Sequence, residues 1–200
     1  MAKAQSDGDR DAIDLLTEDH KRVQKLFKDF ERTGRDDEEA LREVVETACV
    51  ELQIHAVLEE EIFYPAVRVQ AQDDAQEDLL NQAEVEHEAV DELIAKLHEL
   101  GAGDAMYAAY FSVLSEYVKH HIREEEKALF PQVKKMTALD LQQLAEDMRL
   151  RREEVFAEIE SDDESELEAS SGEDDDAGTS AADELLEDEE EQIPPTRARH

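Results

Sequence analysis

Apolar residues recur at steps of three and four positions through about the first 160 residues of the chain. This spacing places them on one face of an α-helix, and no segment shows the convincing alternation typical of a half-buried strand. The sequence contains only four prolines and six glycines, so few positions interrupt the pattern. The pattern therefore predicts an all-α protein.

The apolar stripes predict four principal helices of about 20–30 residues and one shorter helix. Asp36 or Asp37, Asp104 and Thr137 are the expected N-caps of the second, fourth and fifth helices. The expected ranges are 11–32, 37–68, 74–100, 104–136 and 138–160. Because the connections are short, neighbouring helices should be antiparallel, which predicts an up-down-up-down four-helix bundle with an extra C-terminal helix.

Charge divides the chain of 200 residues, whose net charge is −35. Residues 161–200 contain 16 Asp and Glu against two Arg, with almost no apolar residues to offset the entropy of ordering. They are predicted to form a disordered acidic tail, and residues 1–10 a flexible N-terminus. Residues 11–160 then form one domain, with its core at 11–136 and the additional helix at 138–160.

The composition also excludes several classes of function. So negative a surface would repel nucleic acid and anionic membranes. No apolar run approaches the roughly 18 residues of a membrane span, and the polar N-terminus does not resemble a signal peptide. Cys49 is the only cysteine, so no intrachain disulfide can form. A cytoplasmic protein is expected.

Four of the seven histidines interrupt the apolar stripes, one in each principal helix: His20, His55, His87 and His121. A single inward-facing histidine is usually a satisfied core residue. Four buried imidazoles in one bundle, however, cost free energy unless each has a partner. Together they indicate a shared binding site.

Two glutamates strengthen this interpretation, because His55 is followed four positions later by Glu59 and His121 by Glu125. That spacing puts both side chains of a pair on one helix face. A proline follows each histidine by ten positions, at Pro65 and at 131, so the motif is duplicated. Two related helix pairs would bring matching nitrogen and carboxylate ligands together, a set that suits iron, manganese or zinc.

These six residues resemble the ligand set of the hemerythrin-like (HHE cation-binding) domain family, over about residues 11–136. The resemblance implies two iron ions in a non-haem di-iron centre, with Mn or Zn as other candidates. It also implies that Glu59 and Glu125 bridge the ions and that His20, His55, His87 and His121 are terminal ligands.

Some positions stay open as additional ligands. Asp91 stands where oxygen-carrying members of that family have a further histidine, and is a candidate ligand, a hydrogen-bond partner of an imidazole, or a surface residue. Glu51 and Tyr117 each lie one turn before a ligand histidine. His120 is expected to face solvent. His98 is expected to lie near the C-terminal end of its helix, where a cationic imidazole interacts favourably with the helix dipole.

A di-iron centre of this kind implies binding of, or reaction with, a small ligand such as O2, peroxide or NO. A second hypothesis is an iron store or an iron or redox sensor without turnover. A third is a metal-free helical interaction module. Whether the protein is an enzyme is left open, as is its oligomeric state, and any electron donor would be another molecule.

Overall fold

The computed structural model describes residues 10–71 and 73–171, and all regular structure within them is helical, as predicted. The chain divides into two units, Met1–Asp162 and Asp163–His200. The bundle and the candidate site lie in the first unit. Among the described residues, no helix is both long and apolar enough to cross a lipid bilayer.

The N-termini of three helices are fixed by aspartates, whose carboxylates accept otherwise unpaired backbone N–H groups. Helix α1 (Ala12–Arg32) is capped by Asp11, which accepts from the N–H of the residue three positions later. Asp37 caps α2 (Glu38–Leu58) and Asp73 caps α4 (Asp74–Glu99) in the same way. The predicted starts of the first three helices therefore agree with the structure.

Two of the predicted helices are interrupted by a π-helical turn. Helix α2 continues into the π-segment η2 (Glu59–Phe63) and α3 (Tyr64–Gln70), and α5 (Tyr107–Glu124) into η3 (Glu125–Leu129) and α6 (Phe130–Val133). Pro65 and the proline at 131 follow these segments; proline lacks an N–H and its ring clashes with the carbonyl four residues earlier. The wider turn accommodates that clash, so the duplicated prolines explain why the turn occurs twice.

Two predicted caps were wrong. Helix α5 begins at Tyr107 because residues 104–106 form turns, and Asp104 Oδ1 accepts the N–H of Met106 at 2.7 Å. Asp140, not Thr137, caps the last helix: its Oδ1 accepts the N–H of residue 143 at 3.0 Å.

The end predicted for the last helix, near residue 160, was also wrong. Helix α7 (Leu141–Ser171) continues beyond it, into the start of the predicted acidic tail. The remainder of that predicted tail, 172–200, lies outside the described residues, as do residues 1–9 of the predicted flexible N-terminus.

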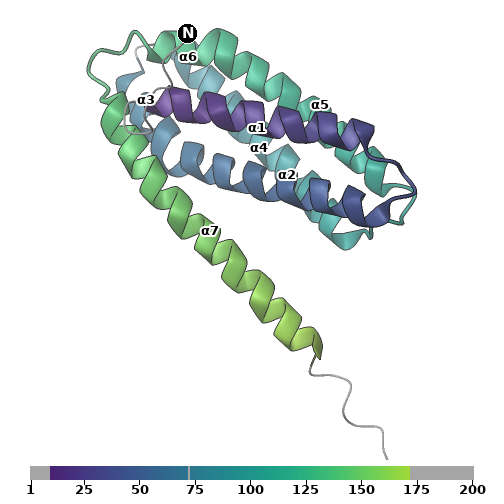
Figure 1. Cartoon of the computed structure of the whole chain (residues 1–200). Helices are drawn as coiled ribbons and strands as arrows, with labels where there is room; N and C mark the ends of the chain where they lie inside the picture. Colours follow the sequence, from purple (N-terminus) through teal and green to yellow (C-terminus); the bar gives the residue numbers. More distant parts are fainter. Residues whose placement is uncertain (1–9, 72, 172–200) are drawn as a thin grey trace, which may run out of the picture. The chain divides into compact units, whose positions relative to one another are not determined.

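The bundle is built from two helix pairs, α1 with α2 and α4 with α5, and the four helices run alongside one another (Figure 1). Their buried apolar side chains form two separate clusters. The first contains Phe27, Val45, Ile94 and Phe111, and the second contains Leu16, Leu58, Phe63 and Met148 of α7. Between the two clusters lies a layer of buried polar side chains, which is the candidate site.

Candidate metal centre

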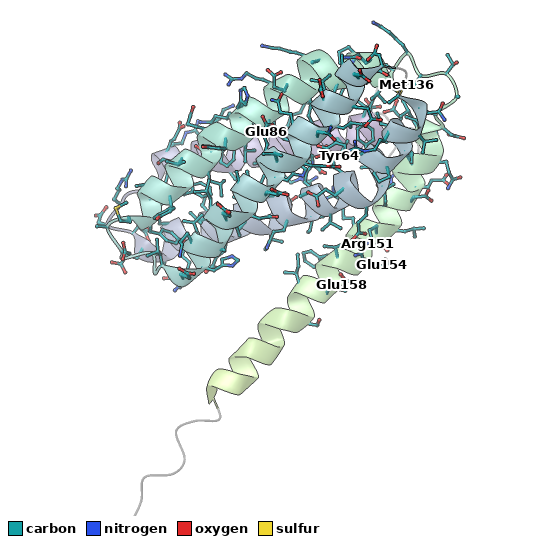
Figure 2. All side chains as sticks on the ribbon, turned by 180° about the vertical axis from the view of Figure 1, so that it is seen from behind. Tyr64, Glu86, Met136, Arg151, Glu154 and Glu158 are labelled. Carbon is teal, nitrogen blue, oxygen red and sulfur yellow. The ribbon has the colours of Figure 1, made fainter. Side chains whose placement is uncertain are left out.

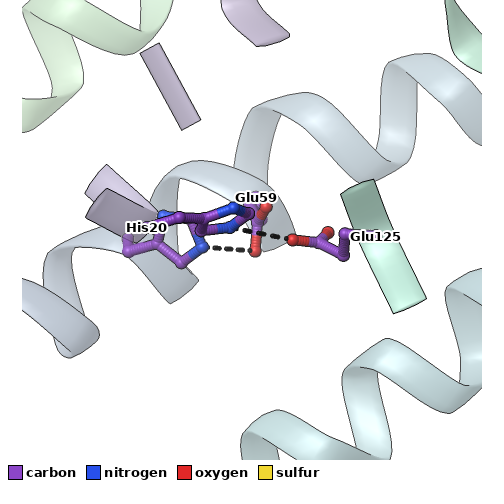
Figure 3. A group of neighbouring side chains, drawn as sticks. His20, Glu59 and Glu125 are labelled. Atoms are coloured by element: carbon purple, nitrogen blue, oxygen red, sulfur yellow. Dashed lines mark ion pairs between the residues drawn. The ribbon is translucent and has the colours of Figure 1, made fainter. Parts of the chain in front are cut away.

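All six predicted ligands meet in one buried layer, because each helix turns its histidine towards the bundle axis. The four imidazoles are 2–5 % exposed, Glu59 is fully buried and Glu125 is 2 % exposed. Figure 3 shows His20 beside the two carboxylates. The sequence interpretation had therefore selected residues that come together in space.

Each histidine directs its Nε2 atom at a central carboxylate. His20 Nε2 lies 3.1 Å from Glu125 Oε2, and His55 Nε2 lies 3.2 Å from Glu59 Oε2. In the other half, His87 Nε2 is 3.4 Å from Glu59 Oε2 and His121 Nε2 is 3.4 Å from Glu125 Oε2. Glu125 therefore contacts one histidine from each helix pair, whereas Glu59 contacts His55 of the first pair and both histidines of the second, with His121 Nε2 at 3.8 Å.

The polar atoms form two overlapping groups with ligand atoms within 4.8 Å of one another. The first comprises four residues, His20, His55, Glu59 and Glu125, and the second comprises Glu59, His87 and His121. Glu59 belongs to both groups. The two groups of candidate ligand atoms therefore share one carboxylate.

The π-turns begin at the two central glutamates. The N–H of Tyr64 bonds to the carbonyl of Glu59, and the N–H of Phe130 bonds to the carbonyl of Glu125, each five residues back. Such single π-turns are rare and are often found at functional sites. Here the wide turn and both carboxylates coincide, and the histidine one turn earlier stays in register with each glutamate.

The other ring nitrogen of every histidine faces an outer carboxylate, which sequence reasoning missed. The Nδ1 atoms of His20, His55, His87 and His121 lie 3.1, 3.5, 2.7 and 3.0 Å from carboxylate oxygens of Glu126, Asp19, Glu60 and Glu86, respectively. A carboxylate at Nδ1 holds the proton there and leaves the Nε2 lone pair free for a metal ion. The only sequence signal was that each acid directly follows a central glutamate or directly precedes a histidine.

Tyr64 was expected only to fill the core, but its hydroxyl joins the site. The side chain is fully buried, and Oη lies 2.9 Å from both Glu59 Oε2 and Glu125 Oε1. Its single proton can be donated to either carboxylate. Phe130, at the matching position of the second half, lacks a hydroxyl and stacks on His20 with ring centroids 5.7 Å apart.

Asp19 connects the site to helix α7. This carboxylate is 2 % exposed and is paired with His55, with Arg22 of its own helix and with Arg152 of α7. Burial by itself would raise the pKa of Asp19, but these three partners outweigh it and lower the pKa. The outer partner of His55 therefore stays ionised and is held in place by two arginines.

The chemistry of the donor atoms fits a bound cation. The Nε2 atoms of His20 and His55, together with Glu59 Oε1 and Glu125 Oε2, are buried without a hydrogen-bond partner. The Nε2 atoms of His87 and His121 lie only 3.2 Å apart, although the outer carboxylates hold protons at their Nδ1 atoms. Two facing lone pairs repel unless a proton or a metal ion lies between them.

The pKa values express the same need for positive charge. Burial opposes protonation of His55, but Glu59 and Asp19 outweigh it and raise the pKa to about 10. The pKa of His121 is likewise raised well above its usual value. Burial opposes ionisation of Glu59, yet the neighbouring histidines lower its pKa well below the usual value. Among the described residues, every ion pair of Glu59 or Glu125 is with a histidine, so protons or metal ions supply the counter-charge.

Other candidate residues lie away from the two groups. Asp91 is exposed and belongs to neither group, although it lines the adjacent cavity. Glu51 pairs with Arg22 and Arg152. Tyr117 is 49 % exposed, and His120 faces solvent as predicted, with a side chain 50 % exposed.

A small cavity of about 20 Å³ adjoins the histidines on the side of the first apolar cluster. That volume holds about one water-sized molecule. The four ligand histidines form part of its wall, and the rest is mainly aliphatic: Val23, Leu52, Val90, Val118 and Ile122. The cavity beside the site is therefore small and lined largely by apolar side chains.

Fold and site together define a class of protein, a helical bundle whose buried histidine and carboxylate side chains are grouped to hold a cation. Within that class, the chain belongs to the hemerythrin HHE cation-binding domain family, whose model matches residues 11–133. The family match ends before α7 begins.

The fold also resembles the crystal structure of a hemerythrin HHE cation-binding domain-containing protein from Mycobacterium kansasii. The TM-score is 0.60 at 22 % sequence identity, covering 73 % of this chain and 87 % of that one. At that identity the similarity shows the fold alone. Comparison with curated proteins gives no significant match.

Proposed function

We propose that the chain holds two iron ions in this layer and that the centre binds or reacts with a small molecule such as O2, peroxide or NO. The observation that carries the proposal is the orientation of the four histidines. Each Nε2 faces a shared central carboxylate, and each Nδ1 faces an outer carboxylate. A packing role would not require both orientations four times.

In this proposal, His20 and His55 would hold one ion, His87 and His121 would hold the other, and Glu59 and Glu125 would be shared by both. Six protein side chains shared by two ions leave coordination positions open, as in reactive rather than structural sites. Bound ferrous ions would supply electrons to a small ligand. Manganese and zinc accept the same nitrogen and oxygen donors, so metal identity is part of the test.

The surrounding residues would have separate tasks. The aliphatic cavity wall would admit a small neutral ligand and exclude water. The outer carboxylates would orient the imidazoles, and the Tyr64 hydroxyl would orient both central carboxylates from the side of the second apolar cluster. Electrons for repeated turnover would come from a separate donor. A cytoplasmic location remains a prediction of the sequence.

Metal analysis by mass spectrometry, combined with visible spectra in air and after reduction, tests this function. We expect two iron ions per chain and an oxo-to-iron charge-transfer band that disappears on reduction. Peroxide consumption and NO binding, measured on the same sample, would distinguish the ligands. A folded protein that contains no metal and takes up no Fe2+ anaerobically would contradict the proposal.

A second candidate function, an iron store or an iron or redox sensor, is favoured by one observation. Arg152 connects α7, which lies beyond the family match, to the buried Asp19 beside His55. Occupancy of the centre could therefore change how firmly α7 is held. A sensor should show a large difference in protease cleavage near α7 between metal-free and metal-loaded protein, without consuming peroxide.

A further inference from the structure

Two grooves on the bundle surface are related by the internal repeat. Position 20 corresponds to 87, an offset of 67, and position 55 corresponds to 121, an offset of 66. One groove lies between α2 and α4 and the other between α1 and α5, with volumes of about 350 and 320 Å³. With these offsets, every residue that lines the α1/α5 groove has its counterpart in the lining of the α2/α4 groove: Gln24, Lys28, Glu31, Lys119 and Arg123 correspond to Asp91, Ala95, His98, Gln53 and Val57.

The two grooves carry opposite charge. The α2/α4 groove contains the carboxylates of Glu60 and Asp91 and has neither Lys nor Arg in its lining. Its counterpart contains Lys28, Lys119 and Arg123, with Glu31 as its only acid. Corresponding positions of the repeat thus form a surface that attracts cations on one side of the bundle and a surface that repels them on the other.

Of the two grooves, the acidic one adjoins the cavity beside the histidines. Ala56 and Asp91 line both the α2/α4 groove and that inner cavity, whereas no residue lines both the α1/α5 groove and the cavity. The counterpart of Ala56 is the bulky Ile122, which is 2 % exposed. Because the side chain of Ala56 is small, few atoms separate the α2/α4 groove from the inner cavity at this position.

The groove also ends at atoms that need a cation. His55 lines the inner cavity, is 5 % exposed, and its Nε2 atom has no hydrogen-bond partner. Glu60 Oε1, at the groove, lies 2.7 Å from His87 Nδ1. A cation attracted to Glu60 and Asp91 in the groove would therefore be separated from the buried ligands mainly by the side chain of Ala56.

We propose that the α2/α4 groove is the passage by which divalent cations reach and leave the buried centre, with Asp91 attracting the ion and Ala56 forming the narrow point. This inference rests on the proposed metal-binding function. It assigns Asp91 to the passage and not to the ligand set, in keeping with its exposure and its absence from both ligand groups.

Metal-loading kinetics of the full-length, metal-free protein test the passage, with Co2+ followed by its visible absorption and Fe2+ followed anaerobically. Asp91→Asn should slow association about threefold at low salt, the effect of one nearby charge in water, and the difference should shrink as salt is added. Ala56→Leu should slow metal association and metal release equally, because a narrower passage hinders both directions. The final metal content should stay unchanged in both variants.

Matched controls exist in the other groove and on the surface. Glu31→Gln removes the same charge from the α1/α5 groove and should leave loading unchanged. Ala95→Leu narrows the outer part of the α2/α4 groove from an exposed position, so it tests the passage even where Ala56→Leu impairs folding. Ala109→Leu, an exposed alanine of α5 outside both grooves, is its control.

Each outcome separates the hypotheses. Normal loading of the Asp91, Ala56 and Ala95 variants would overturn the passage, and slower loading of Glu31→Gln alone would move it to the α1/α5 groove. A reduced metal content of Asp91→Asn at saturating Co2+ would make Asp91 a ligand and overturn its assignment here. If the unaltered protein binds neither Co2+ nor Fe2+, the proposed function fails, and the passage with it.

Discussion

The hydroxyl of Tyr64 lies 2.9 Å from Glu125 Oε1, although the two residues are 61 positions apart in the chain. The same hydroxyl lies 2.9 Å from Glu59, so one phenol connects both central carboxylates. In the second half of the repeat the corresponding residue is Phe130, which has no hydroxyl. The centre is thus built from two related halves but has a donor on one side only.

Tyr64→Phe should fold, because Phe130 shows that the bundle accepts phenylalanine at the matching position. It should lower the free energy of unfolding of the metal-free protein by about 1–3 kcal/mol, since a buried carboxylate loses a donor. Urea unfolding measures the change. Tyr107→Phe, at a buried tyrosine of the first apolar cluster, is the control and should cost less. Equal losses in the two variants would contradict the assigned role of Tyr64.

Glu59→Gln and Glu125→Gln should lower metal content to different extents. In the proposed centre both glutamates bridge the ions, so each substitution should lower the binding of both; Glu59 belongs to both groups of ligand atoms and Glu125 to one, so Glu59→Gln should lower it further. Mass spectrometry of metal content after reconstitution measures the difference. Glu61→Gln, at a neighbouring surface glutamate paired with Arg151, should keep full metal content.

The same two variants address the third hypothesis, that of a metal-free interaction module. Under that hypothesis, both substitutions would leave metal content at zero and stability unchanged or raised, because a buried charge is removed without the loss of a metal ligand. Unaltered stability together with no metal in the parent protein would therefore favour that hypothesis.

Arg152→Gln should destabilise the bundle more than Arg151→Gln does. Arg152 pairs with Asp19, which is 2 % exposed and would keep only Arg22 and His55 as partners, so we expect a loss of about 1–3 kcal/mol. Arg151 pairs with the exposed acids Glu61, Glu154 and Glu158, two of them on α7 (Figure 2), and exposed pairs contribute less than about 1 kcal/mol.

Thermal or urea unfolding compares the two arginine variants. A second measurement, the rate at which a chelator removes metal, separates a structural role from a role at the site. Because Asp19 orients His55, Arg152→Gln should release metal faster, whereas Arg151→Gln should not. Equal release rates would show that α7 only packs on the bundle.

The metal-free protein should lose stability as the pH rises from about 6.5 towards 10. The pKa of His55 is raised from 6.5 to about 10 in the folded chain, because Glu59 and Asp19 outweigh its burial. A raised folded-state pKa gives stability that is fully present below the unfolded value and is lost as pH rises through the folded one. Unfolding midpoints measured across this pH range test the direction.

Metal binding should respond to pH in the opposite sense. Ligand imidazoles must be neutral, so loading the centre releases protons, and metal affinity should rise over the range in which the metal-free protein weakens. Proton release on Co2+ binding can be followed with an indicator dye. If affinity did not change with pH, the histidines would not be the ligands.

The helical fold and the six central residues could be predicted from spacing along the chain. Each inward histidine occupies a position at which the apolar pattern, with its steps of three and four residues, would place an apolar side chain. Each central glutamate lies one helical turn after a histidine of the same helix. These are relationships within single helices, where spacing alone fixes which side chains share a face. The repeat of histidine, glutamate and proline then indicated that both halves serve one centre, and the structure brings all six side chains together.

The other residues that surround the site could be identified only once the helices were placed beside one another. Glu60, Glu86 and Glu126 each adjoin a predicted ligand, yet in a chain with 56 acidic residues such neighbours look like ordinary helix surface. Whether one of them meets an imidazole depends on how a second helix is rotated and placed beside the first. The position of Tyr64 Oη between two carboxylates and the contact of Arg152 with Asp19, 133 residues away, arise in the same way. Spacing along one helix carries no information on these contacts between helices, because they are set by packing.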